Sequence, residues 1–409
     1  MRVAIVIAFA AIRYWWLLRR DNTKRWKPSQ AAWDRAHAKT GKAIYRLATR
    51  MGGAFVKLGQ VLGARADVMP PAFIAPLRGL HDKVPARPLE KLRKHVEHEL
   101  GRPLEEVFAH VEPTAIAAAS LAQVHRAKLA SGEDVVIKIQ YPEARRLFPI
   151  DFKSLRRAVR VARWLNRGLD LRHLVDELAQ FVLLELDFSR ERTSTARVRA
   201  NLAGNSRVVV PLVHEEISTS KLLVLGFIQG TPLTAADTLR ERGVDLRDVA
   251  RRVAGLYATM IFEHGFFHGD PHPGNILVLD DGRLGLLDFG LAKELPPGFS
   301  RSAATMIASA MAGDAQKAVA AAREIGFVID DEVAGDLLAL VRTLLGDNKN
   351  AGQLLQHVRR GRLEIPSHFT LIIRVLVILS GVSHTLVPGE RVIGGALASA
   401  LAPHFARAG

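Results

Sequence analysis

Two carboxylates and one amide follow each other at the spacing used by metal-dependent phosphoryl transfer. Within the segment 268–275 (HGDPHPGN), Asp270 precedes Asn275 by five positions, and Asp288 opens an Asp-Phe-Gly tripeptide thirteen residues later. Carboxylate and amide oxygens hold Mg²⁺ where the γ-phosphoryl group of ATP is transferred, and one further carboxylate positions the acceptor. We therefore predict that Asn275 and Asp288 bind the metal, and that Asp270 positions an acceptor or a water molecule.

The cation that this chemistry needs is Lys138, in a predicted strand over 135–140. A turn at 131–134 joins this strand to another over 121–129. A strand lysine or an isolated Asp-Phe-Gly is a weak signal, but the order, spacing and context of the three motifs agree. They predict a protein-kinase-like site in which Lys138 contacts the phosphates of ATP or ADP.

The elements that must position these residues indicate a two-lobed, protein-kinase-like α+β fold. Two short strands flank the turn 280–282 (DDG), so that Asp288 would lie just past a buried strand end. A helical N-terminal extension precedes the lobes. Helices are predicted over 31–65, 89–100, 150–166 and 171–197, and strands over 208–213, 221–227, 276–279 and 284–287. The predicted divisions are an apolar and basic segment (1–30), an all-helical extension (31–112), an N-lobe (113–229) and a C-lobe (230–409).

Composition limits the partners. The chain has no cysteine, which excludes disulfides and thiolate metal sites. Its formal net charge of +16 favours anionic lipid, phosphorylated small molecules or nucleic acid. No reader module or basic–aromatic platform accompanies the charge, so nucleic acid is not expected as a partner.

The N-terminal segment allows two interpretations. Residues 3–12 are apolar, and Trp15 and Trp16 precede Arg19 and Arg20. The apolar run is too short to span a bilayer, but aromatic residues beside arginines suit a membrane interface. The alternative is a helix packed on the protein's own core. The first interpretation predicts peripheral or N-terminal anchoring at the cytoplasmic face of a membrane. A second apolar run, 371–379, is interrupted by Arg374 and is predicted to be a buried helix.

Together the motifs resemble the UbiB/AarF family of atypical kinases, which is linked to quinone and isoprenoid-lipid metabolism. The resemblance runs from about residue 31 to 386 and rests on the segments 57–60 (KLGQ), 117–120 (AAAS), 185–188 (ELDF) and 268–275. It implies a Mg-dependent ATPase or kinase that acts on a small molecule or lipid, such as a quinone precursor. The alternative is a nucleotide-binding regulator or scaffold of a lipid-biosynthesis complex. Neither interpretation predicts an oligomeric state.

The resemblance also assigns roles to the helical extension and to the acidic motif. Lys57 and Gln60 are three positions apart, so they share a helix face. The resemblance implies that this helix covers the pocket where a protein kinase seats its peptide, with Lys57 directed at the nucleotide. Glu185 and Asp187 would then partner Lys57 or a metal.

The alanine segment stands where a kinase has a glycine-rich phosphate loop. The Cβ atoms of alanine restrict the backbone conformations with which such a loop closes on phosphates. The resemblance implies an altered ATP/ADP preference and suppressed phosphorylation of the protein itself. The residues concerned are Ala117, Ala118, Ala119 and Ser120.

The spacing of the sequence does not decide which acidic residue pairs with Lys138. Glu177 and Glu185 both lie in the predicted helix 171–197, whereas Glu191 is interpreted as structural. We predict Glu177 as the partner, which leaves Glu185 to the acidic motif.

Two departures from protein kinases bear on the acceptor, and one departure from the family pattern concerns the hinge. Gly269 replaces the arginine of His-Arg-Asp, so a switch operated by activation-loop phosphorylation is not expected. Only residues 291–297 intervene before helical sequence resumes, too few for a peptide platform. The hinge sequence 225–227 (LGF) has glycine where the family usually has glutamate. His268 and His272 are interpreted as hydrogen-bonding residues that shape the loop, rather than as metal ligands.

Overall fold

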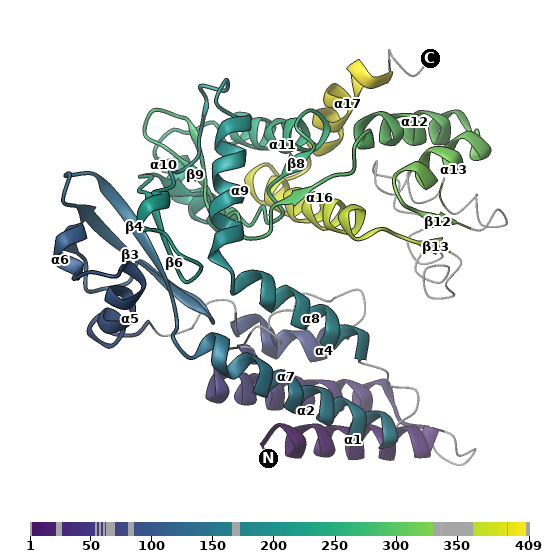
Figure 1. Cartoon of the computed structure of the whole chain (residues 1–409). Coiled ribbons are helices and arrows are strands. Elements are labelled where there is room, and N and C mark those ends of the chain that lie inside the picture. Colours follow the sequence, from purple (N-terminus) through teal and green to yellow (C-terminus); the bar gives the residue numbers. More distant parts are fainter. Residues whose placement is uncertain are drawn as a thin grey trace. The chain divides into compact units, whose positions relative to one another are not determined.

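The computed structural model of the chain divides into two compact units. Unit 1 comprises Met1–Arg192 and Val213–Phe227, and unit 2 comprises Thr193–Leu212 and Ile228–Gly409. Each unit has its own core and is described by itself (Figure 1). The residues described are 2–21, 27–53, 55–56, 59, 62, 70–80, 86–165, 172–329, 337, 363–390 and 392–405.

Unit 1 contains one antiparallel sheet, ordered β1-β3-β4-β6, with β2 paired to β3. Its strands are β1 (Phe108–Val111), β2 (Ala117–Ala118), β3 (Ala122–Leu129), β4 (Asp134–Gln140) and β6 (Leu222–Gly226). Its helices are α1 (Arg2–Asp21), α2 (Gln30–Met51), α4 (Pro71–Ile74), η1 (Ala75–Leu80), α5 (Glu90–Leu100), α6 (Leu104–Val107), α7 (Ala144–Leu165), α8 (Arg172–Glu185), η2 (Glu215–Ile217) and the start of α9 (Phe188–Asn201).

The two-residue period of β4 separates the core of unit 1 from the site. Val135, Ile137 and Ile139 are fully buried and share a core cluster with α5. Since alternate side chains of a strand point to opposite faces, Lys138 lies on the other face of the sheet. Phe188, at the start of α9, packs on β6 residues in a separate cluster. The sheet therefore directs Lys138 toward the beginning of α9.

The N-terminal helix α1 packs along α7 and α2 (Figure 1). Ala11 is buried in this contact, and the Tyr14 hydroxyl and His37 Nδ1 lie 2.8 Å apart. Phe9 and Trp16 of the same helix are 64% and 49% exposed. The segment is thus a packed helix that also carries an exposed apolar surface.

Two predicted elements of unit 1 were wrong. The chain does not form a single helix over 171–197, because it leaves the helix at Leu186 and restarts at Phe188. The Leu186 carbonyl accepts hydrogen bonds from Gln140 and Arg145, and Asp187 Oδ1 caps the new helix by accepting from Ser189 N–H at 3.1 Å. The segment 31–112 is also not all-helical, since β1 pairs with β3.

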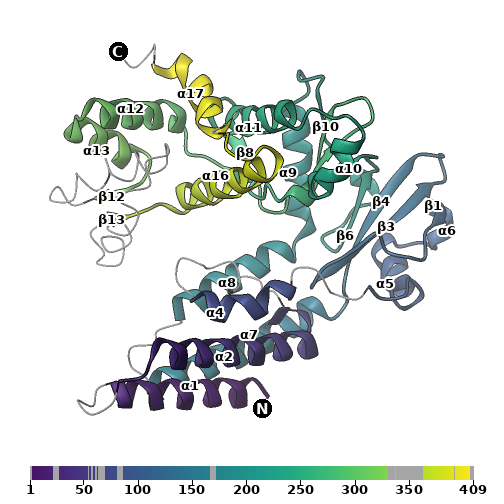
Figure 2. The ribbon, with the colours of Figure 1, turned by 180° about the vertical axis from the view of Figure 1, so that it is seen from behind.

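Unit 2 is mainly helical, with a four-stranded sheet ordered β5-β10-β9-β7 and a pair β11-β8. The predicted hairpin is β9–β10, and Gly282 takes the positive φ of 82° that its turn requires. The helices α11, α12, α16 and α17 enclose one large core (Figure 2). Its elements are the end of α9, β5 (Val208–Val209), β7 (Thr231–Pro232), η3 (Leu233–Ala235), α10 (Ala236–Glu241), α11 (Leu246–Phe262), β8 (Phe266–Phe267), η4 (Pro273–Asn275), β9 (Ile276–Val278), β10 (Leu284–Leu286), β11 (Lys293–Glu294), α12 (Phe299–Ala312), α13 (Ala315–Glu324), β12 (Val328–Ile329), β13 (Leu363–Glu364), α16 (Ser367–Leu386) and α17 (Val392–Phe405).

Helix α16 is the one described helix that is long and apolar enough to cross a membrane, judged by length and composition alone. One side of it, including Phe369, Ile372 and Val375, is buried in the core of unit 2. A core helix of a soluble protein passes the same test.

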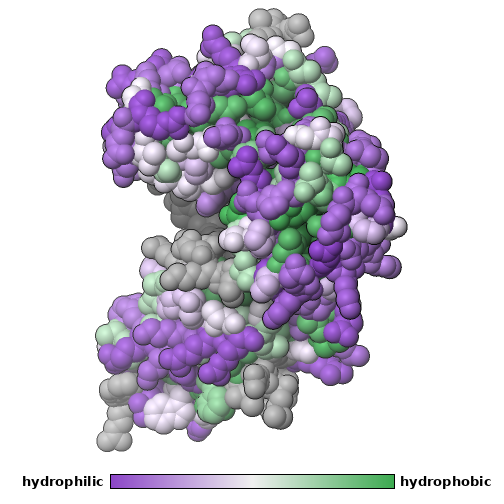
Figure 3. Space-filling view, turned by 90° about the vertical axis from the view of Figure 1, so that its left-hand side faces the viewer, coloured by the Kyte–Doolittle hydropathy of each residue, from purple (hydrophilic) through white to green (hydrophobic). Residues whose placement is uncertain are grey.

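On the face of the molecule in Figure 3, hydrophilic side chains make up much of the surface.

Candidate functional site

The catalytic-loop residues lie in one turn of unit 2, between β8 and β9. Asn275 Nδ2 lies 3.3 Å from the Asp270 carbonyl oxygen and 3.4 Å from Asp270 Oδ2. Because the amide nitrogen is directed at Asp270, the amide oxygen is the atom that Asn275 can offer to a cation. The turn is closed by His272 Nδ1, which accepts a hydrogen bond from Gly274 N–H.

Asp288 follows directly on β10 and has an uncommon backbone. Its φ is 60°, and it is the only positive φ of a non-glycine residue in the described part of the chain. Such a conformation costs on the order of 1–3 kcal/mol and persists where the surroundings fix it. Asp288 Oδ1 accepts a hydrogen bond from Gly290 N–H at 3.2 Å, and Phe289 is buried.

His268 connects the two acidic turns. Its Nε2–H donates to the Leu287 carbonyl at 2.8 Å, and its Nδ1 accepts from the Asp270 N–H at 3.3 Å and from the Tyr257 hydroxyl at 3.0 Å. The ring is fully buried, and burial lowers the pKa of His268. A neutral ring with its proton on Nε2 satisfies all three contacts.

Gly269 has no room for a side chain. A Cβ atom there would lie 2.1 Å from the Leu291 carbonyl oxygen and 3.2 Å from the Leu371 side chain. The segment after Asp-Phe-Gly therefore lies directly on the catalytic loop, where the arginine of His-Arg-Asp would begin. This contact gives a physical reason for glycine at position 269.

A cation comes instead from α16. A guanidinium nitrogen of Arg374 lies 3.8 Å from Asp270 Oδ1, with the two side chains 45% and 30% exposed. The contact is at the outer limit of an ion pair. It places a positive charge beside the carboxylate that was predicted to position the acceptor.

Unit 1 contributes a tight ion pair. Lys138 Nζ lies 2.7 Å from both carboxylate oxygens of Glu191, which is 6% exposed. The ammonium group also lies 5.3 Å from the centre of the Phe188 ring. A strand lysine held by a helix carboxylate is the arrangement that kinase-like phosphate binding uses, although here α7 and α8 come between β4 and the helix that carries Glu191.

The sequence model of the ABC1 atypical kinase-like domain matches residues 79–322. The chain belongs to this family. The fold described above is accordingly the kinase-like α+β fold of the ABC1 domain, and the predicted resemblance to the UbiB/AarF kinases is confirmed.

Relatives carry kinase names. Protein ACTIVITY OF BC1 COMPLEX KINASE 7, chloroplastic, from Arabidopsis thaliana is 32% identical over 359 residues, which is 83% of this chain and 51% of that protein. AarF domain-containing protein kinase 1 from Xenopus tropicalis is 30% identical over 314 residues, 76% of this chain and 59% of that protein. The chain thus spans roughly half to two thirds of the length of such relatives.

A solved structure is also similar. The Rv3197 protein of Mycobacterium tuberculosis, determined in complex with erythromycin, superposes with a TM-score of 0.59 at 25% identity. The likeness covers 90% of this chain and 97% of that one.

Several predicted site residues lie outside the described part of the structure. Lys57 and Gln60 are among them, so their proposed place over the pocket stays a prediction. Glu177 belongs to α8, but its side chain is not described. Glu185 and Asp187 flank the break between α8 and α9.

The partner of Lys138 corrects the sequence assignment. Glu191, interpreted from the sequence as structural, is the carboxylate that meets the lysine with both oxygens. The prediction of Glu177 assumed one continuous helix. The break at Leu186 changes which residues of this region face the sheet, and Glu191 then falls on the first turn of α9.

The alanine segment forms the β2–β3 hairpin. Ala117 and Ala118 pair with β3, and the turn is closed by Ala119 N–H donating to the Ala122 carbonyl at 2.8 Å. Ser120 is buried at 7% exposure, whereas Ala117 and Ala119 are exposed. The segment has the hairpin place of a kinase phosphate loop, with Cβ atoms where glycines leave none.

The oxygen atoms at the two acidic turns suit Mg²⁺ bound together with a nucleotide better than a metal ion held by protein ligands alone. No cluster of three or more His, Asp or Glu side chains able to hold a metal occurs among the described residues. Mg²⁺ needs only one or two protein oxygens when nucleotide phosphates and water supply the rest. The Asp288 carboxylate and the Asn275 amide oxygen are of this kind.

Sequence reasoning missed the roles of Arg374 and Tyr257. Arg374 was visible as the single charge in the apolar run 371–379, which is a signal of a buried or functional contact. Tyr257 gave no signal, because tyrosine at a helical core position is common. Only the fold brings either residue to the loop.

Proposed function

We propose that this ABC1 domain binds Mg-ATP and transfers or hydrolyses its γ-phosphoryl group. The observation that carries the proposal is that each unit, taken by itself, holds its kinase-like residues in an ordered arrangement. In unit 1 Lys138 Nζ donates to the Glu191 carboxylate, and in unit 2 Asp270, Asn275 and Asp288 belong to one hydrogen-bonded turn system. When bound, Mg²⁺ with ATP would neutralise the charge of the transferred group.

Each protein residue then has a separate task. Asp288 and the Asn275 amide oxygen would hold the metal, and Lys138 would contact the α- and β-phosphates. Asp270 would orient the acceptor hydroxyl or a water molecule and accept its proton. Arg374 would keep the Asp270 carboxylate in one orientation.

A small-molecule or lipid acceptor suits this site better than a protein. The Leu291 backbone lies on Gly269, so the segment after Asp-Phe-Gly is occupied in shaping the loop. The similar Rv3197 protein was solved with a small molecule, erythromycin. With the UbiB/AarF resemblance, these features support a role in quinone or isoprenoid-lipid metabolism.

Helix α1 supports placement at an anionic membrane surface. Phe9, Ile12 and Trp16 recur at helical spacing and are 49–64% exposed. Arg19 and Arg20 lie against the Trp15 and Trp16 rings, which is how residues at a lipid interface combine an apolar face with charge. We propose that α1 lies in the headgroup region, on the cytoplasmic side.

The test of the chemistry is phosphate release by the purified full-length chain, with and without anionic vesicles and quinone-like phenols. We expect Mg-dependent turnover that Asp288→Asn abolishes. Asp281→Asn, in the exposed β9–β10 turn, is the matched control and should retain activity. Turnover that persists unchanged in Asp288→Asn would refute the assigned mechanism.

The membrane placement has its own test. Trp15→Gln with Trp16→Gln should weaken sedimentation with anionic vesicles, while Met311→Gln, which is 61% exposed in unit 2, should not. Equal binding by all variants would contradict the assignment of α1.

A nucleotide-binding regulator without phosphotransfer is the second candidate. It is favoured by the Arg374 contact, because a carboxylate already engaged by a cation is a poorer proton acceptor. Nucleotide binding without turnover under every condition would select this function.

A further inference from the structure

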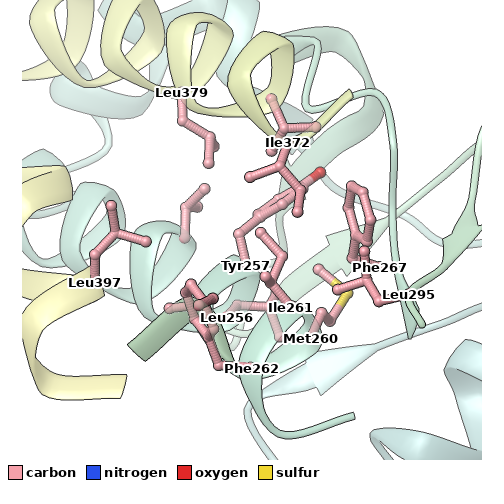
Figure 4. Close-up of a cluster of buried hydrophobic side chains, with 14 of the residues drawn as sticks. Leu256, Tyr257, Met260, Ile261, Phe262, Phe267, Leu295, Ile372, Leu379 and Leu397 are labelled. Carbon is pink, nitrogen blue, oxygen red and sulfur yellow. The ribbon is translucent and has the colours of Figure 1, made fainter. Parts of the chain in front are cut away.

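Tyr257 is packed in the hydrophobic core of unit 2. Figure 4 shows Tyr257 among Ile261, Phe267, Ile372 and other side chains, none of the labelled ones besides Tyr257 carrying a hydroxyl. The residue is 1% exposed. Phenylalanine would fill nearly the same volume without burying a polar group, so packing alone does not account for tyrosine.

The hydroxyl has one partner that explains it. It lies 3.0 Å from His268 Nδ1, and the Nε2 of the same ring is 2.8 Å from the Leu287 carbonyl. A carbonyl can only accept, so Nε2 carries a proton. The Asp270 N–H is directed at Nδ1, so Nδ1 is an acceptor and the tyrosine hydroxyl donates to it. The hydrogen bond thus selects one tautomer and one orientation of the ring.

The ring so oriented holds the backbone on both sides of the site. Its Nδ1 also accepts from Asp270 N–H, at 3.3 Å. The Leu287 carbonyl belongs to the peptide that leads into Asp288, whose φ of 60° needs support from its surroundings. Tyr257 on α11 is therefore connected through one ring to both acidic turns.

We propose that Tyr257 is a positioning residue, whose hydroxyl acts through His268 to fix the backbone of Asp270 and Asp288 relative to each other. It contacts neither nucleotide nor metal in this scheme. The proposal rests on the proposed function for its effect on turnover, but the hydrogen bond itself can be tested independently.

The test compares Tyr257→Phe with Tyr141→Phe. Tyr141 is also buried, and its hydroxyl donates to Gln123 Oε1 at 3.3 Å in unit 1, so it controls for loss of a buried hydroxyl elsewhere. We expect Tyr257→Phe to lower kcat and the affinity for Mg²⁺ about 10- to 100-fold, the range for residues that orient metal ligands. At saturating Mg²⁺ the KM for nucleotide should stay near the wild-type value, because Lys138 is untouched. Tyr141→Phe should change neither.

An independent readout is the imidazole ¹⁵N spectrum of the full chain, in which the His268 signals are assigned by their loss in His268→Asn. Wild type should show a neutral Nε2–H ring with a hydrogen-bonded Nδ1. In Tyr257→Phe the Nδ1 resonance should move toward that of a free acceptor. An unchanged resonance would overturn the hydrogen bond, and a moved resonance with unchanged kcat would overturn the positioning role.

A double variant covers the case in which Tyr257→Phe is simply unstable. If the effect passes through the ring, Tyr257→Phe should add no further loss of kcat in the His268→Asn background. Additive losses would overturn the proposal. Absence of turnover in wild type would refute the proposed function and with it the effect on kcat, whereas the spectrum would still decide whether the hydrogen bond exists.

Discussion

The two units hold their functional charges in opposite ways. In unit 1, Lys138 and Glu191 form a short, bidentate pair from which solvent is nearly excluded. In unit 2, Asp270 and Arg374 stand 3.8 Å apart and are partly exposed. The first pair is short and bidentate, while the second is a single long contact.

This difference suggests a division between a fixed and an adjustable half. A buried pair is costly to break, because the remaining charge is left without a partner in low dielectric. A loose, exposed pair contributes little to stability and responds to its surroundings. We expect mutations in unit 1 to act on folding and nucleotide affinity, and mutations at Arg374 to act on turnover.

Glu191→Gln should show the largest effect on the fixed half. The mutation removes the negative charge that meets the Lys138 ammonium group, which is 19% exposed, and we expect the free energy of unfolding to fall by about 3 kcal/mol. Nucleotide affinity should fall as well. Urea denaturation and nucleotide titration measure the two effects. Arg156→Gln, which removes an exposed pair with Asp176, is the control and should cost under about 1 kcal/mol. Equal losses in the two variants would remove the distinction between buried and exposed pairs.

Gly269→Ala tests whether the loop 268–275, which carries Asp270, is rigid. The new Cβ would meet the Leu291 carbonyl, so we expect a loss of about 2 kcal/mol in unfolding free energy and a large fall in turnover. Gly255→Ala is the matched control, since a Cβ at this α11 position meets nothing within 4 Å. It should be neutral or stabilising by up to about 1 kcal/mol. A Gly269→Ala protein with wild-type stability would show that the segment after Asp-Phe-Gly can move aside.

Arg374→Gln should separate stability from turnover. The contact with Asp270 is long and partly exposed, so the unfolding free energy should change by less than about 1 kcal/mol. The kcat should fall about tenfold, because Asp270 loses the charge that orients it. Arg247→Gln, which removes an exposed pair with Glu390 in the same unit, should leave kcat unchanged. A rise in kcat would instead mean that Arg374 restrains Asp270, as the regulator hypothesis requires.

The smallest expected effect is on the pH dependence of stability. It contrasts Asp151, to which the described residues bring no stabilising cation, with Glu294, which pairs with Arg197. Burial raises the pKa of Asp151 in α7 to about 6. Its folded state therefore binds the proton more tightly than the unfolded state, and stability declines as pH rises from about 4 to about 6. Asp151→Asn should lessen this decline in thermal unfolding scans, modestly because the group is half exposed to solvent. Glu294, whose pKa is lowered by the hydrogen bond with Arg197, should act in the opposite direction. A steeper decline in Asp151→Asn would contradict the assignment.

The sequence predicted the parts of this molecule that local patterns determine. The hairpins β3–β4 and β9–β10 follow from alternating apolar residues and turn residues, and they place Lys138 within β4 and Asp288 just past the end of β10. The kinase-like fold followed from the order of these motifs. The internal geometry of the segment 268–275 is also local, since its hydrogen bonds join residues a few positions apart.

The remaining parts depend on contacts between distant segments. The helix break before α9 is stabilised by Gln140, Arg145 and the Ser220 carbonyl, which accepts from Phe188 N–H. Without that break, the periodicity of 171–197 leaves the partner of Lys138 undecided. Arg374 meets Asp270 only because α16 packs in the same core as the catalytic loop. A single sequence can mark a residue such as Arg374 as unusual, but it does not show which distant residue it contacts.

Two neighbouring strands of the sheet in unit 1, β4 and β6, are far apart in the sequence, so the ribosome synthesises them at different times. Strand β4 pairs on one side with β3, its immediate neighbour, but on the other side with β6, as in the pairing of Ile137 with Val224. Between them the chain forms α7, α8 and α9 and enters unit 2. A nascent chain that has emerged only to residue 192 therefore exposes an unpaired β4 edge, which is a site for misassociation. We expect truncations at the apparent boundary after Arg192 to aggregate, and expression of unit 1 alone to require residues 213–227 supplied on the same polypeptide.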